Sequence, residues 1–574
     1  ESLVGEWVQE VENQVFEEVS FKGGWEAWDD VKGGRLPYKL VKGARKEEVG
    51  YMVKRGMWLL RPIQECWEKL GRGPTSVKWV DTNKGTPEDI MVRSRLVARD
   101  FKGSDKDRDD LFAGTPPLEA KRMLMSRAAT ARRDKRVRKM LFIDVRKAHC
   151  NPLCEEDEYI QLPEECECPP GMCGKLVYWL YGFRPAAAAW ERMYSGKLNE
   201  VGFVRGSSCG VVFYHPERDL SLVVHGDDFT FCGVEEDLEW IKGLMGEWFD
   251  IKIRGVLGGG EDDVKQITLL GRVVTWTPEG IEYEADPRHR KMVLDYFGLG
   301  SESKESLATN GEKEEEVMPG DEVELDPKEA TEYRGVAARV NYLSLDCPDL
   351  QFPVKQCSRE MAKPTKGSWR KLKRVARYML GVDSVKWLFK WQEEPSCCHV
   401  LADSDWGGNV KDRKSTSGGV WMLGNHCIKT WSASQGPYAL SSAEAEFYAM
   451  IEAVTRAKGL VSLANELGFA GLSNVIHLGT DSSAAKSFVS RRGLGKMRHI
   501  EIRDLWLQKE VLEGKVLVSK VLGTENPADL MTKLLSKAEI ISRLKGMNLR
   551  LDSRSDVMMV EPVEVDSRRR KKGV

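Results

Sequence analysis

Short apolar runs divided by polar turns predict several strands in the first half of the chain. Residues 76–101 predict two strands joined by a polar turn at Thr82–Asp89, and a helix is predicted at 118–131. Residues 140–145 are apolar except for one carboxylate, Asp144. A charged group inside a buried strand is costly unless it is paired or bound to a metal, so Asp144 is a candidate functional acid.

Two adjacent carboxylates interrupt a second apolar region. Residues 221–232 are apolar on both sides of a short Gly-Asp turn, which predicts a β-hairpin with Asp227 and Asp228 at its tip. Neighbouring like charges repel each other, and a divalent cation removes that repulsion. The hairpin alone leaves two interpretations open, an ordinary solvated turn or one part of a metal site.

The last third of the chain follows a different pattern, after predicted helices at 329–345 and 369–380. Its predicted strands are 398–403, 418–424, 426–433, 474–480 and 515–522, and its predicted helices are 442–467 and 526–535. Three strands, a helix, a strand, and a later strand and helix predict an α/β domain built on a mixed sheet.

Composition limits the class of protein. A chain of 574 residues suggests about three to five domains or subdomains. Hydrophobic residues make up 41% and charged residues 31%, so the chain can bury real cores. The formal net charge of −2 is no global signature of nucleic-acid binding, so such a surface needs local charge segregation. No apolar run approaches the roughly 18–20 residues that span a bilayer, and we expect no membrane partner.

Charge is biased in three segments. Residues 132–139 form a basic run that is either a solvated face or a set of phosphate contacts. Residues 301–329 carry many acids and predict a flexible linker. Residues 567–572 are basic and predict either a nuclear-import signal or a disordered tail.

The cysteines bear on the redox compartment of the protein, and the first residue bears on whether the chain is a fragment. The thirteen cysteines lack an obvious disulfide framework, which fits a reducing compartment. Four of them share one loop-like stretch without paired C-x-x-C spacing, so they are either reduced thiols or a zinc site: Cys154, Cys166, Cys168 and Cys173. Because the chain begins with Glu1 rather than Met, we expect a piece of a longer protein.

Three of the acids converge if their strands are neighbours in one sheet. Asp144, Asp227 and Asp228 could then surround two Mg²⁺ ions roughly 3.5–4 Å apart. Such a pair of metals suits phosphoryl transfer, in which the protein positions substrates and neutralises charge.

A second set of acids lies at the ends of elements in the C-terminal domain: Asp403, Glu446, Asp481 and Asp529. One acid from each element can bind two metals, with water as the nucleophile. Glu444 is a rival to Glu446, but Ser441-x-x-Glu444 is a capping box. Asp405 is a rival to Asp403 and is expected to cap or contact the turn. His499 either assists product release or makes a structural hydrogen bond.

Several short motifs occur in a fixed order from about residue 60 to 545. They are Lys78-Trp-Val, Arg95-Leu-Val-Ala, Asp144-Val-Arg-Lys-Ala148, Leu180-Tyr-Gly182, Trp190, His225-Gly-Asp-Asp228, Leu269-Leu-Gly271, Tyr333-Arg, Asn341-Tyr-Leu343, Pro348-Asp349, Asp412-Arg-Lys-Ser-Thr-Ser-Gly418 and Arg498-His-Ile-Glu-Ile-Arg503. Together they resemble the reverse transcriptase and ribonuclease H of copia-like long-terminal-repeat retrotransposons.

The resemblance implies an α+β fold, in which a right-hand polymerase with fingers, palm and thumb precedes an α/β ribonuclease H-like domain with a mixed five-stranded sheet. The implied segments are 1–60 (unassigned N-terminal extension), 61–300 (fingers and palm), 301–328 (acidic linker), 329–394 (thumb or connection helices), 395–545 (ribonuclease H-like domain) and 546–574 (basic tail). The protease and integrase of such a polyprotein are not recognisable, so a fragment of Pol is expected.

The resemblance also assigns roles to residues. The seven catalytic metal ligands would be Asp144, Asp227, Asp228, Asp403, Glu446, Asp481 and Asp529, holding Mg²⁺ or alternatively Mn²⁺. Lys78 and Arg95 would lie in the fingers and touch the triphosphate, unless they are ordinary strand-surface cations. His149 would lie beneath the sugar, and Leu269 and Gly271 would grip the primer end.

The implied activity is RNA-directed DNA polymerisation with linked ribonuclease H cleavage. Its partners would be an RNA template, a DNA primer, the RNA–DNA hybrid and deoxynucleoside triphosphates, in the cytoplasm within a virus-like particle and in the nucleus. The chain departs from the family at His225 (usually Tyr), His149 (usually Phe or Tyr) and Pro185 (usually Gln). The departures at His149 and Pro185 motivate the alternative of a weak or inactive relic that binds nucleic acid or protein partners.

Overall fold

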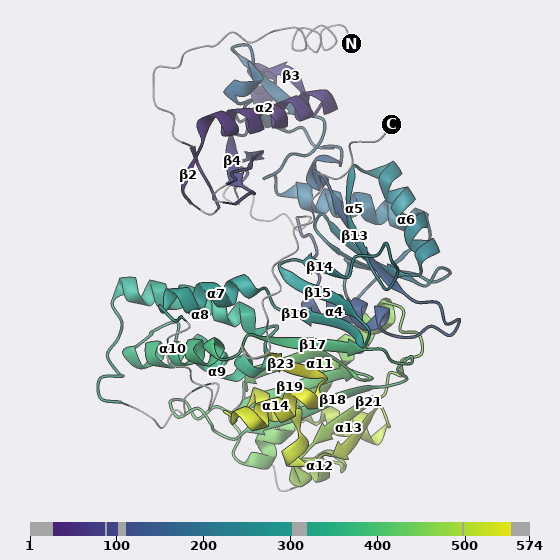
Figure 1. The fold of residues 1–574 in the computed structure, drawn as a ribbon, viewed down its shortest axis with the longest axis vertical. Coiled ribbons are helices and arrows are strands. Elements are labelled where there is room, and N and C mark those ends of the chain that lie inside the picture. Colours follow the sequence, from purple (N-terminus) through teal and green to yellow (C-terminus); the bar gives the residue numbers. More distant parts are fainter. Residues whose placement is uncertain are drawn as a thin grey trace.

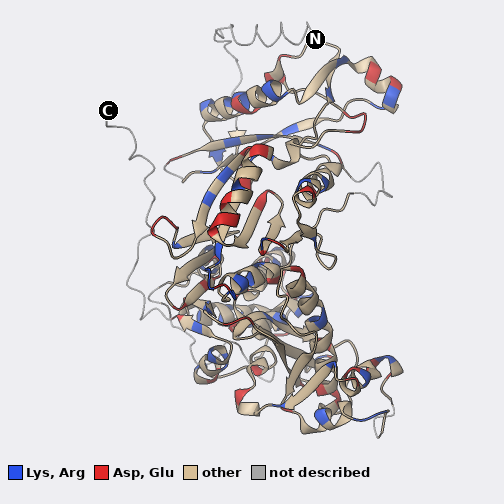
Figure 2. Ribbon diagram, turned by 90° about the vertical axis from the view of Figure 1, so that its right-hand side faces the viewer, with Lys and Arg blue, Asp and Glu red and all other residues tan. Residues whose placement is uncertain are grey.

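The computed structural model describes residues 27–31, 33–86, 89–101, 111–300, 303, 311, 318–495 and 499–552. Most of the predicted acidic linker and of the predicted basic tail lies outside these residues. In Figure 1 the elements nearest the N-terminus lie at the top, and the green and yellow elements of the last third of the chain lie in the lower half. Basic and acidic residues are interspersed along the described ribbon (Figure 2). None of the described helices has the length and apolar character needed to cross a membrane.

The first unit combines two helices, a three-stranded sheet and two two-stranded sheets. Its elements are β1 (Ala27–Trp28), β2 (Arg35–Leu36), α2 (Tyr38–Arg55), β3 (Trp58–Pro62), α3 (Ile63–Leu70), β4 (Val77–Asn83), β5 (Val92–Ala98), β7 (Tyr159–Ile160) and β8 (Met172–Leu176). The hairpin β4–β5 confirms the two strands predicted within residues 76–101. A buried ion pair of 2.6 Å between Arg45 and Asp81 fixes α2, part of the unassigned extension, to β4.

The second unit is a six-stranded sheet in the order β13-β6-β12-β11-β10-β9. Its strands are β6 (Lys139–Val145), β9 (Val204–Arg205), β10 (Val212–His215), β11 (Leu220–His225), β12 (Asp228–Gly233) and β13 (Ile251–Leu257). Leu141 and Ile143 pack into one core with α5 (Pro185–Glu200) and α6 (Glu235–Trp248), whereas Met140 and Phe142 join the core that contains α4 (Leu118–Ala128). Burial on both faces explains the unbroken apolar run of β6.

The third unit is a five-stranded antiparallel sheet flanked by helices. Its order is β14 (Gln266–Leu269), β15 (Arg272–Thr277), β16 (Gly280–Glu284), β17 (Ser384–Lys390) and β23 (Leu549–Asp552), and its helices are α7 (Pro287–Tyr296), α8 (Pro327–Ser344), α9 (Pro348–Arg359) and α10 (Lys366–Leu380). The sheet therefore takes strands from both sides of the predicted boundaries at residues 300 and 545. The basic tail was predicted from residue 546, but the described chain continues as β23 to Asp552.

The fourth unit contains the mixed five-stranded sheet that the sequence predicts. The order is β20 (His426–Ser434), β19 (Thr416–Leu423), β18 (Cys398–Asp405), β21 (Ile476–Thr480) and β22 (Val516–Lys520). The pairs β20–β19 and β19–β18 are antiparallel, and β18–β21 and β21–β22 are parallel. The helices are α11 (Ser442–Glu466), α12 (Ser483–Val489), α13 (Trp506–Leu512) and α14 (Lys537–Gly546).

One predicted helix of this unit is wrong in its bounds. The segment predicted as a helix at 526–535 is a 3-10 turn, η6 (Pro527–Met531), followed by the separate helix α14. Ser536 ends the irregular stretch because it forms a capping box with Glu539, which starts the new helix.

The C-terminal end of α11 docks on the six-stranded sheet. The Glu466 carboxylate accepts hydrogen bonds from the backbone N–H groups of Ser207 and Ser208 at 2.9 and 2.7 Å. Arg127 on α4 donates to the carbonyl oxygen of Gly468 at 2.5 Å. These contacts join the second and fourth units directly, without the intervening third unit.

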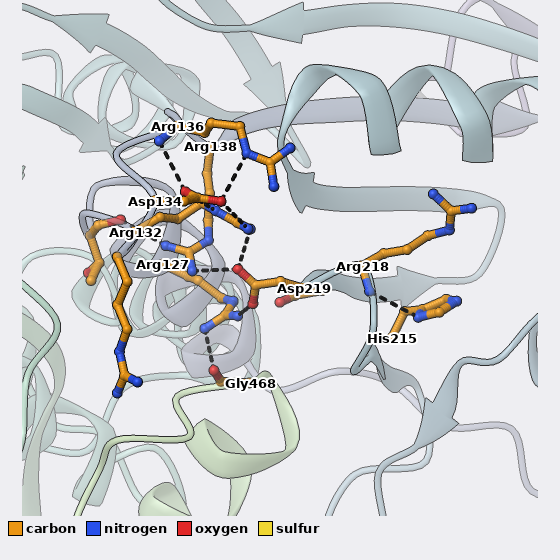
Figure 3. A network of polar contacts seen from close by, with 12 residues as sticks. Arg127, Arg132, Asp134, Arg136, Arg138, His215, Arg218, Asp219 and Gly468 are labelled. Carbon is orange, nitrogen blue, oxygen red and sulfur yellow. Dashed lines mark hydrogen bonds and ion pairs between the residues drawn. The ribbon is translucent and has the colours of Figure 1, made fainter.

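The basic run forms an internal network at this junction (Figure 3). Arg127, Arg132 and Arg138 all contact the carboxylate of Asp219, with 2.7 Å for the Arg138 contact. The carboxylate of Asp134 accepts from Arg132 at 2.9 Å. These guanidinium groups are thus engaged by carboxylates of the same chain rather than being free for phosphate.

Candidate active sites

Strand register brings the first set of acids to the edge of the six-stranded sheet at which β6 ends and β12 begins. Asp144 on β6 lies opposite Asp228 on β12. Asp227 precedes Asp228 in the turn between β11 and β12, and its carbonyl oxygen accepts from the backbone N–H of Val145 at 2.9 Å. Asp227 is exposed, whereas Asp144 and Asp228 are half-buried. Sequence reasoning therefore predicted the neighbourhood of these three residues correctly.

A buried tryptophan fixes the backbone of the turn that carries Asp227. Gly226 has a φ of 65°, which glycine adopts without strain. The indole N–H of Trp190 on α5 donates to the Gly226 carbonyl oxygen at 2.9 Å. Since Trp190 is itself almost fully buried, the position of the turn is fixed by the core rather than by solvent-exposed contacts.

Charge repulsion in this set of acids is only partly relieved by the chain. Burial and the nearby Asp227 and Asp144 carboxylates raise the pKa of Asp228, while Arg254 on β13, at 3.3 Å, opposes that rise. Among the described residues, the three acids do not bring their ligand atoms within 4.8 Å of one another. A cation between them would therefore both reduce the repulsion and draw the carboxylates together.

Two cations near these acids were missed by the sequence reasoning. Arg254 contacts Asp228, and its other nitrogen donates to the Thr268 carbonyl oxygen at 2.7 Å. Lys121 on α4 is buried, and burial with the nearby Arg272 lowers its pKa to about 8, against the attraction of Asp228. Helix α4 also contains the polar residues Arg122 and Arg127, so no signal in its sequence singled out Lys121.

A row of side chains leads from the hairpin β4–β5 toward this edge. Arg95 lies over the ring of Tyr181 at 5.6 Å, and that ring meets His149 edge-on with centroids 5.7 Å apart. Lys78 is exposed and lies on the same face of the hairpin, because its partner Val97 is two residues from Arg95. Burial lowers the pKa of His149, although Asp227 favours its protonated form.

Leu269 and Gly271 belong to a tight hairpin between β14 and β15. Leu269 pairs with Arg272, and the two turn residues Leu270 and Gly271 have φ of 50° and 83°. Positive φ at both central positions is the geometry of a type I′ hairpin. The Arg254 contact to the preceding Thr268 links this hairpin to Asp228.

The second set of acids forms a close group at the ends of β18, β21 and the start of α11. Asp403, Glu446 and Asp481 have ligand atoms that all lie within 4.8 Å of one another, and we call these three residues the carboxylate cluster. Asp403 and Glu446 are 1% and 8% exposed, so their charges are poorly solvated. Parallel neighbours β18 and β21 place Asp403 and Asp481 at the same edge of the sheet.

The electrostatics of the carboxylate cluster fit a cation. Burial, followed by repulsion from Asp403 and Asp481, raises the pKa of Glu446 to about 8. Burial raises the pKa of Asp403 to about 6, against the nearby Lys533. One oxygen of Glu446 accepts from the Ser404 N–H at 3.3 Å, and the other is buried without a hydrogen-bond partner. An unsatisfied buried carboxylate oxygen is a donor that Mg²⁺ would use.

The fourth predicted acid, Asp529, is engaged differently. Its carboxylate pairs with Lys533 at 2.5 Å and with Arg543 at 2.9 Å. Lys533 also contacts Asp403 at 3.3 Å, and Thr532 donates to the same Asp403 carboxylate. Asp529 thus lies beside the carboxylate cluster with its charge already balanced.

The alternative site residues that the sequence offered make contacts outside the carboxylate cluster. Glu444 accepts from the backbone N–H of Leu440 at 2.9 Å, one residue before the expected capping-box partner Ser441. His499 contacts Glu444 at 2.7 Å, which is the structural alternative for this histidine. The Asp405 carboxylate accepts from the Thr416 N–H on β19. Within the described chain, the four clustered cysteines do not converge as a three-ligand metal group.

Comparison with known proteins finds one matching family and several similar proteins. The family described as reverse transcriptase (RNA-dependent DNA polymerase) matches residues 68–259. The Pol polyprotein from transposon TNT 1-94 of Nicotiana tabacum is 25% identical over 520 residues, covering 88% of this chain and 38% of that protein. The Pol polyprotein from transposon RE2 of Arabidopsis thaliana is 26% identical over 489 residues, covering 82% of this chain and 32% of that protein.

A solved structure adds a likeness in part of the chain. The ribonuclease H1 of Halobacterium salinarum aligns with 23% of this chain and 90% of its own, at 17% identity and a TM-score of 0.17. The chain spans about a third of the length of the curated relatives named above, which are retrovirus-related Pol polyproteins. From the ordered motifs, the matching family and these relatives, the chain belongs to the copia-type Pol polyproteins of retrotransposons.

Proposed function

We propose that the chain is an RNA-directed DNA polymerase with a linked ribonuclease H, which copies RNA into DNA and cuts the RNA strand of the hybrid. The observation that carries the proposal is the occurrence of two separate carboxylate sites on one chain. One is the Asp144–Asp228 strand pair with Asp227 at the turn, and the other is the carboxylate cluster. The partners would be an RNA template, a DNA primer, their hybrid and deoxynucleoside triphosphates.

We infer that the units correspond to the parts of a right-hand polymerase. The hairpin β4–β5 and its surrounding unit would be fingers and the six-stranded sheet the palm, within residues 61–300. The helices of residues 329–394 would be the thumb or connection, and residues 395–545 would be the nuclease. The packing of α2 on β4 supports adding the extension before residue 60 to the fingers.

In the polymerase site, Asp144, Asp227 and Asp228 would hold Mg²⁺, with Mn²⁺ as the alternative. When bound, the cation would supply charge neutralisation at the reacting phosphate and activation of the primer hydroxyl. The chain's own contribution is positioning: Trp190 holds the turn through Gly226, and Arg254 limits the repulsion felt by Asp228.

Substrate contacts would come from the row that approaches this edge. Lys78 and Arg95 share one face of their hairpin and could neutralise the triphosphate, since Arg95 has a buried nitrogen without a hydrogen-bond partner among the described residues. His149 would lie under the sugar. The hairpin at Leu269 and Gly271 would hold the primer end near Asp228, through the Arg254 bridge.

In the nuclease site, the carboxylate cluster would hold the cation, and a water molecule would attack the RNA phosphate. The unpartnered oxygen of Glu446 supports this assignment. Asp529 would bind the cation only if its ion pairs with Lys533 and Arg543 gave way, so we assign Asp529 a secondary role. Lys533 would keep Asp403 and Asp529 from repelling each other between turnovers.

Reciprocal variants test both sites in one preparation. Primer extension on an RNA template and cleavage of labelled RNA in a hybrid would be measured with Mg²⁺. We expect Asp227→Asn to abolish extension and preserve cleavage, and Asp481→Asn to do the reverse. Extension by Asp227→Asn at the rate of the unmodified chain would refute the polymerase site, and undiminished cleavage by Asp481→Asn would refute the nuclease site.

A second candidate function is a weak or inactive relic that binds nucleic acid or protein partners. It is favoured by the Arg254–Asp228 pair, which occupies a ligand of the proposed polymerase site, and by the departures at His149 and Pro185. Pro185 begins α5, where its missing N–H costs nothing, but it offers no side-chain hydrogen bond to a nucleotide. Hybrid binding without extension or cleavage in Mg²⁺ or Mn²⁺ would identify this function.

A further inference from the structure

Two histidines lie side by side on the sheet of the fourth unit, away from the carboxylate cluster. His399 on β18 is the direct register partner of His477 on the parallel strand β21. Their ring centroids are 5.0 Å apart, and the rings are inclined by 51°. Register partners project from the same face of a sheet, so both imidazoles lie over the same patch of surface. Asp403 is four residues farther along β18, roughly 13 Å away at 3.3 Å per residue.

A cysteine completes the group. Cys397 is two residues before His399, and its sulfur lies 3.5 Å from Nε2 of that histidine. In a tetrahedral zinc site, with Zn–S of about 2.3 Å and Zn–N of about 2.0–2.1 Å, the ligating sulfur and nitrogen lie roughly 3.5–3.6 Å apart. The observed separation therefore equals one edge of a zinc coordination tetrahedron.

The surroundings leave these donors available. Within the described part of the chain, His477 has no hydrogen-bond partner, and His399 has only the Cys397 contact. The ordinary pKa of histidine is about 6.5, so the neutral, ligating form of imidazole predominates at neutral pH. The antiparallel partner of His399 is Met422, whose thioether adds a further soft atom next to the group.

We propose that Cys397, His399 and His477 form a binding site for a borderline or soft transition-metal ion, with Zn²⁺ as the expected ion. The three donors are not yet all within 4.8 Å of one another, so the site closes by side-chain rotation. His399 is exposed and His477 half-buried, which leaves the rings free to move between rotamers. Three protein ligands leave a fourth position for water or a further ligand.

The site has a structural consequence that does not depend on the proposed catalytic function. A bound ion would cross-link β18 to β21, the two strands that end at Asp403 and Asp481. Thiolate and imidazole prefer Zn²⁺, whereas the carboxylate cluster prefers Mg²⁺, so the two sites should be separable by metal. Zn²⁺ should then raise the thermal stability of the fourth unit in the presence of saturating Mg²⁺.

The test is titration of the full chain with Co²⁺ in excess Mg²⁺, followed by the thiolate-to-cobalt charge-transfer absorption. We expect one equivalent to produce the band and Zn²⁺ to displace it. Cys397→Ser should abolish the band, and His477→Ala should weaken Co²⁺ binding by at least about tenfold. The matched controls Cys154→Ser and His289→Ala alter a half-buried thiol and a half-buried imidazole elsewhere, and should leave the titration unchanged.

Three outcomes would overturn the proposal. They are the absence of a thiolate band, a band that persists in Cys397→Ser, and a band that Cys154→Ser removes. Since Cys397 and His399 lie on the surface, loss of folding is not expected in their variants. His399→Asn provides a second variant, and thermal melting in Mg²⁺ alone would show that each variant is folded before Co²⁺ is added.

Discussion

Replacing Glu446 by glutamine should stabilise the chain in the absence of metal, although it removes a proposed metal ligand. The pKa of Glu446 is raised from 4.5 to about 8 by burial and by the neighbouring carboxylates. Between these pH values the folded state binds more protons than the unfolded state, so the free energy of unfolding falls as pH rises. Glutamine carries no charge at any pH and avoids this loss.

The magnitude follows from the same values. The difference between 4.5 and about 8 corresponds to roughly 5 kcal/mol at about 1.4 kcal/mol per pKa unit. This is an upper limit, because Asp403 and Asp481 share the repulsion. We expect Glu446→Gln to gain about 3 kcal/mol at pH 8.5 and little at pH 4.5. Mg²⁺ should stabilise the unmodified chain at pH 8.5 and have little effect on the variant.

The assay is urea unfolding with EDTA or with Mg²⁺, followed by tryptophan fluorescence. Trp421 and Trp431 are buried in the fourth unit and report its transition. Glu444→Gln is the matched control, since Glu444 is also buried but its carboxylate contacts Leu440, Tyr448 and His499. It should lose stability at both pH values and keep the Mg²⁺ response. A Glu446→Gln variant that is no more stable at pH 8.5, or that Mg²⁺ stabilises fully, would refute the reasoning.

Three further predictions concern metal binding, buried charge and the turn that contains Gly226. Mg²⁺ binding to the carboxylate cluster should strengthen between pH 6 and 8, because Asp403 and Glu446, with pKa values of about 6 and about 8, must lose protons. Calorimetry in buffers of different ionisation enthalpy would measure the number of protons released on binding. Asp219→Asn should cost about 3–5 kcal/mol of unfolding free energy, because it leaves the buried Arg127 without its carboxylate, whereas Asp134→Asn on the surface should change urea unfolding little. Trp190→Phe should slow primer extension about tenfold by releasing the carbonyl of Gly226, with hybrid cleavage unchanged.

The parts of the fold that sequence predicted well are those with a local signal. The hairpin of Asp227 and Asp228 was readable from two apolar runs and a Gly-Asp turn. The strand with Asp144 was readable from a single charge in an apolar run. Asp403 and Glu446 were chosen over their rivals from strand and helix position, and both lie in the carboxylate cluster.

The features that the sequence did not predict depend on contacts between segments that are distant along the chain. Helix α9 contains Pro353, which locally argues against a helix, and a neighbouring core stabilises it nonetheless. Strand β23 has four residues, and its partner β17 lies far earlier in the chain. The balance of charge at Asp529 depends on Arg543 on the following helix, which no motif around Asp529 indicates.

Helix α11 determines the spacing between the two proposed sites. It has 25 residues and carries Glu446 near its first turn and Glu466, docked on the six-stranded sheet, at its last. The two residues are 20 positions apart, which spans roughly 30 Å at 1.5 Å per residue in one continuous helix. One extra residue within this helix would turn Glu446 by about 100° relative to the docked end, so the helix sets both the distance and the rotation of Glu446 relative to the six-stranded sheet.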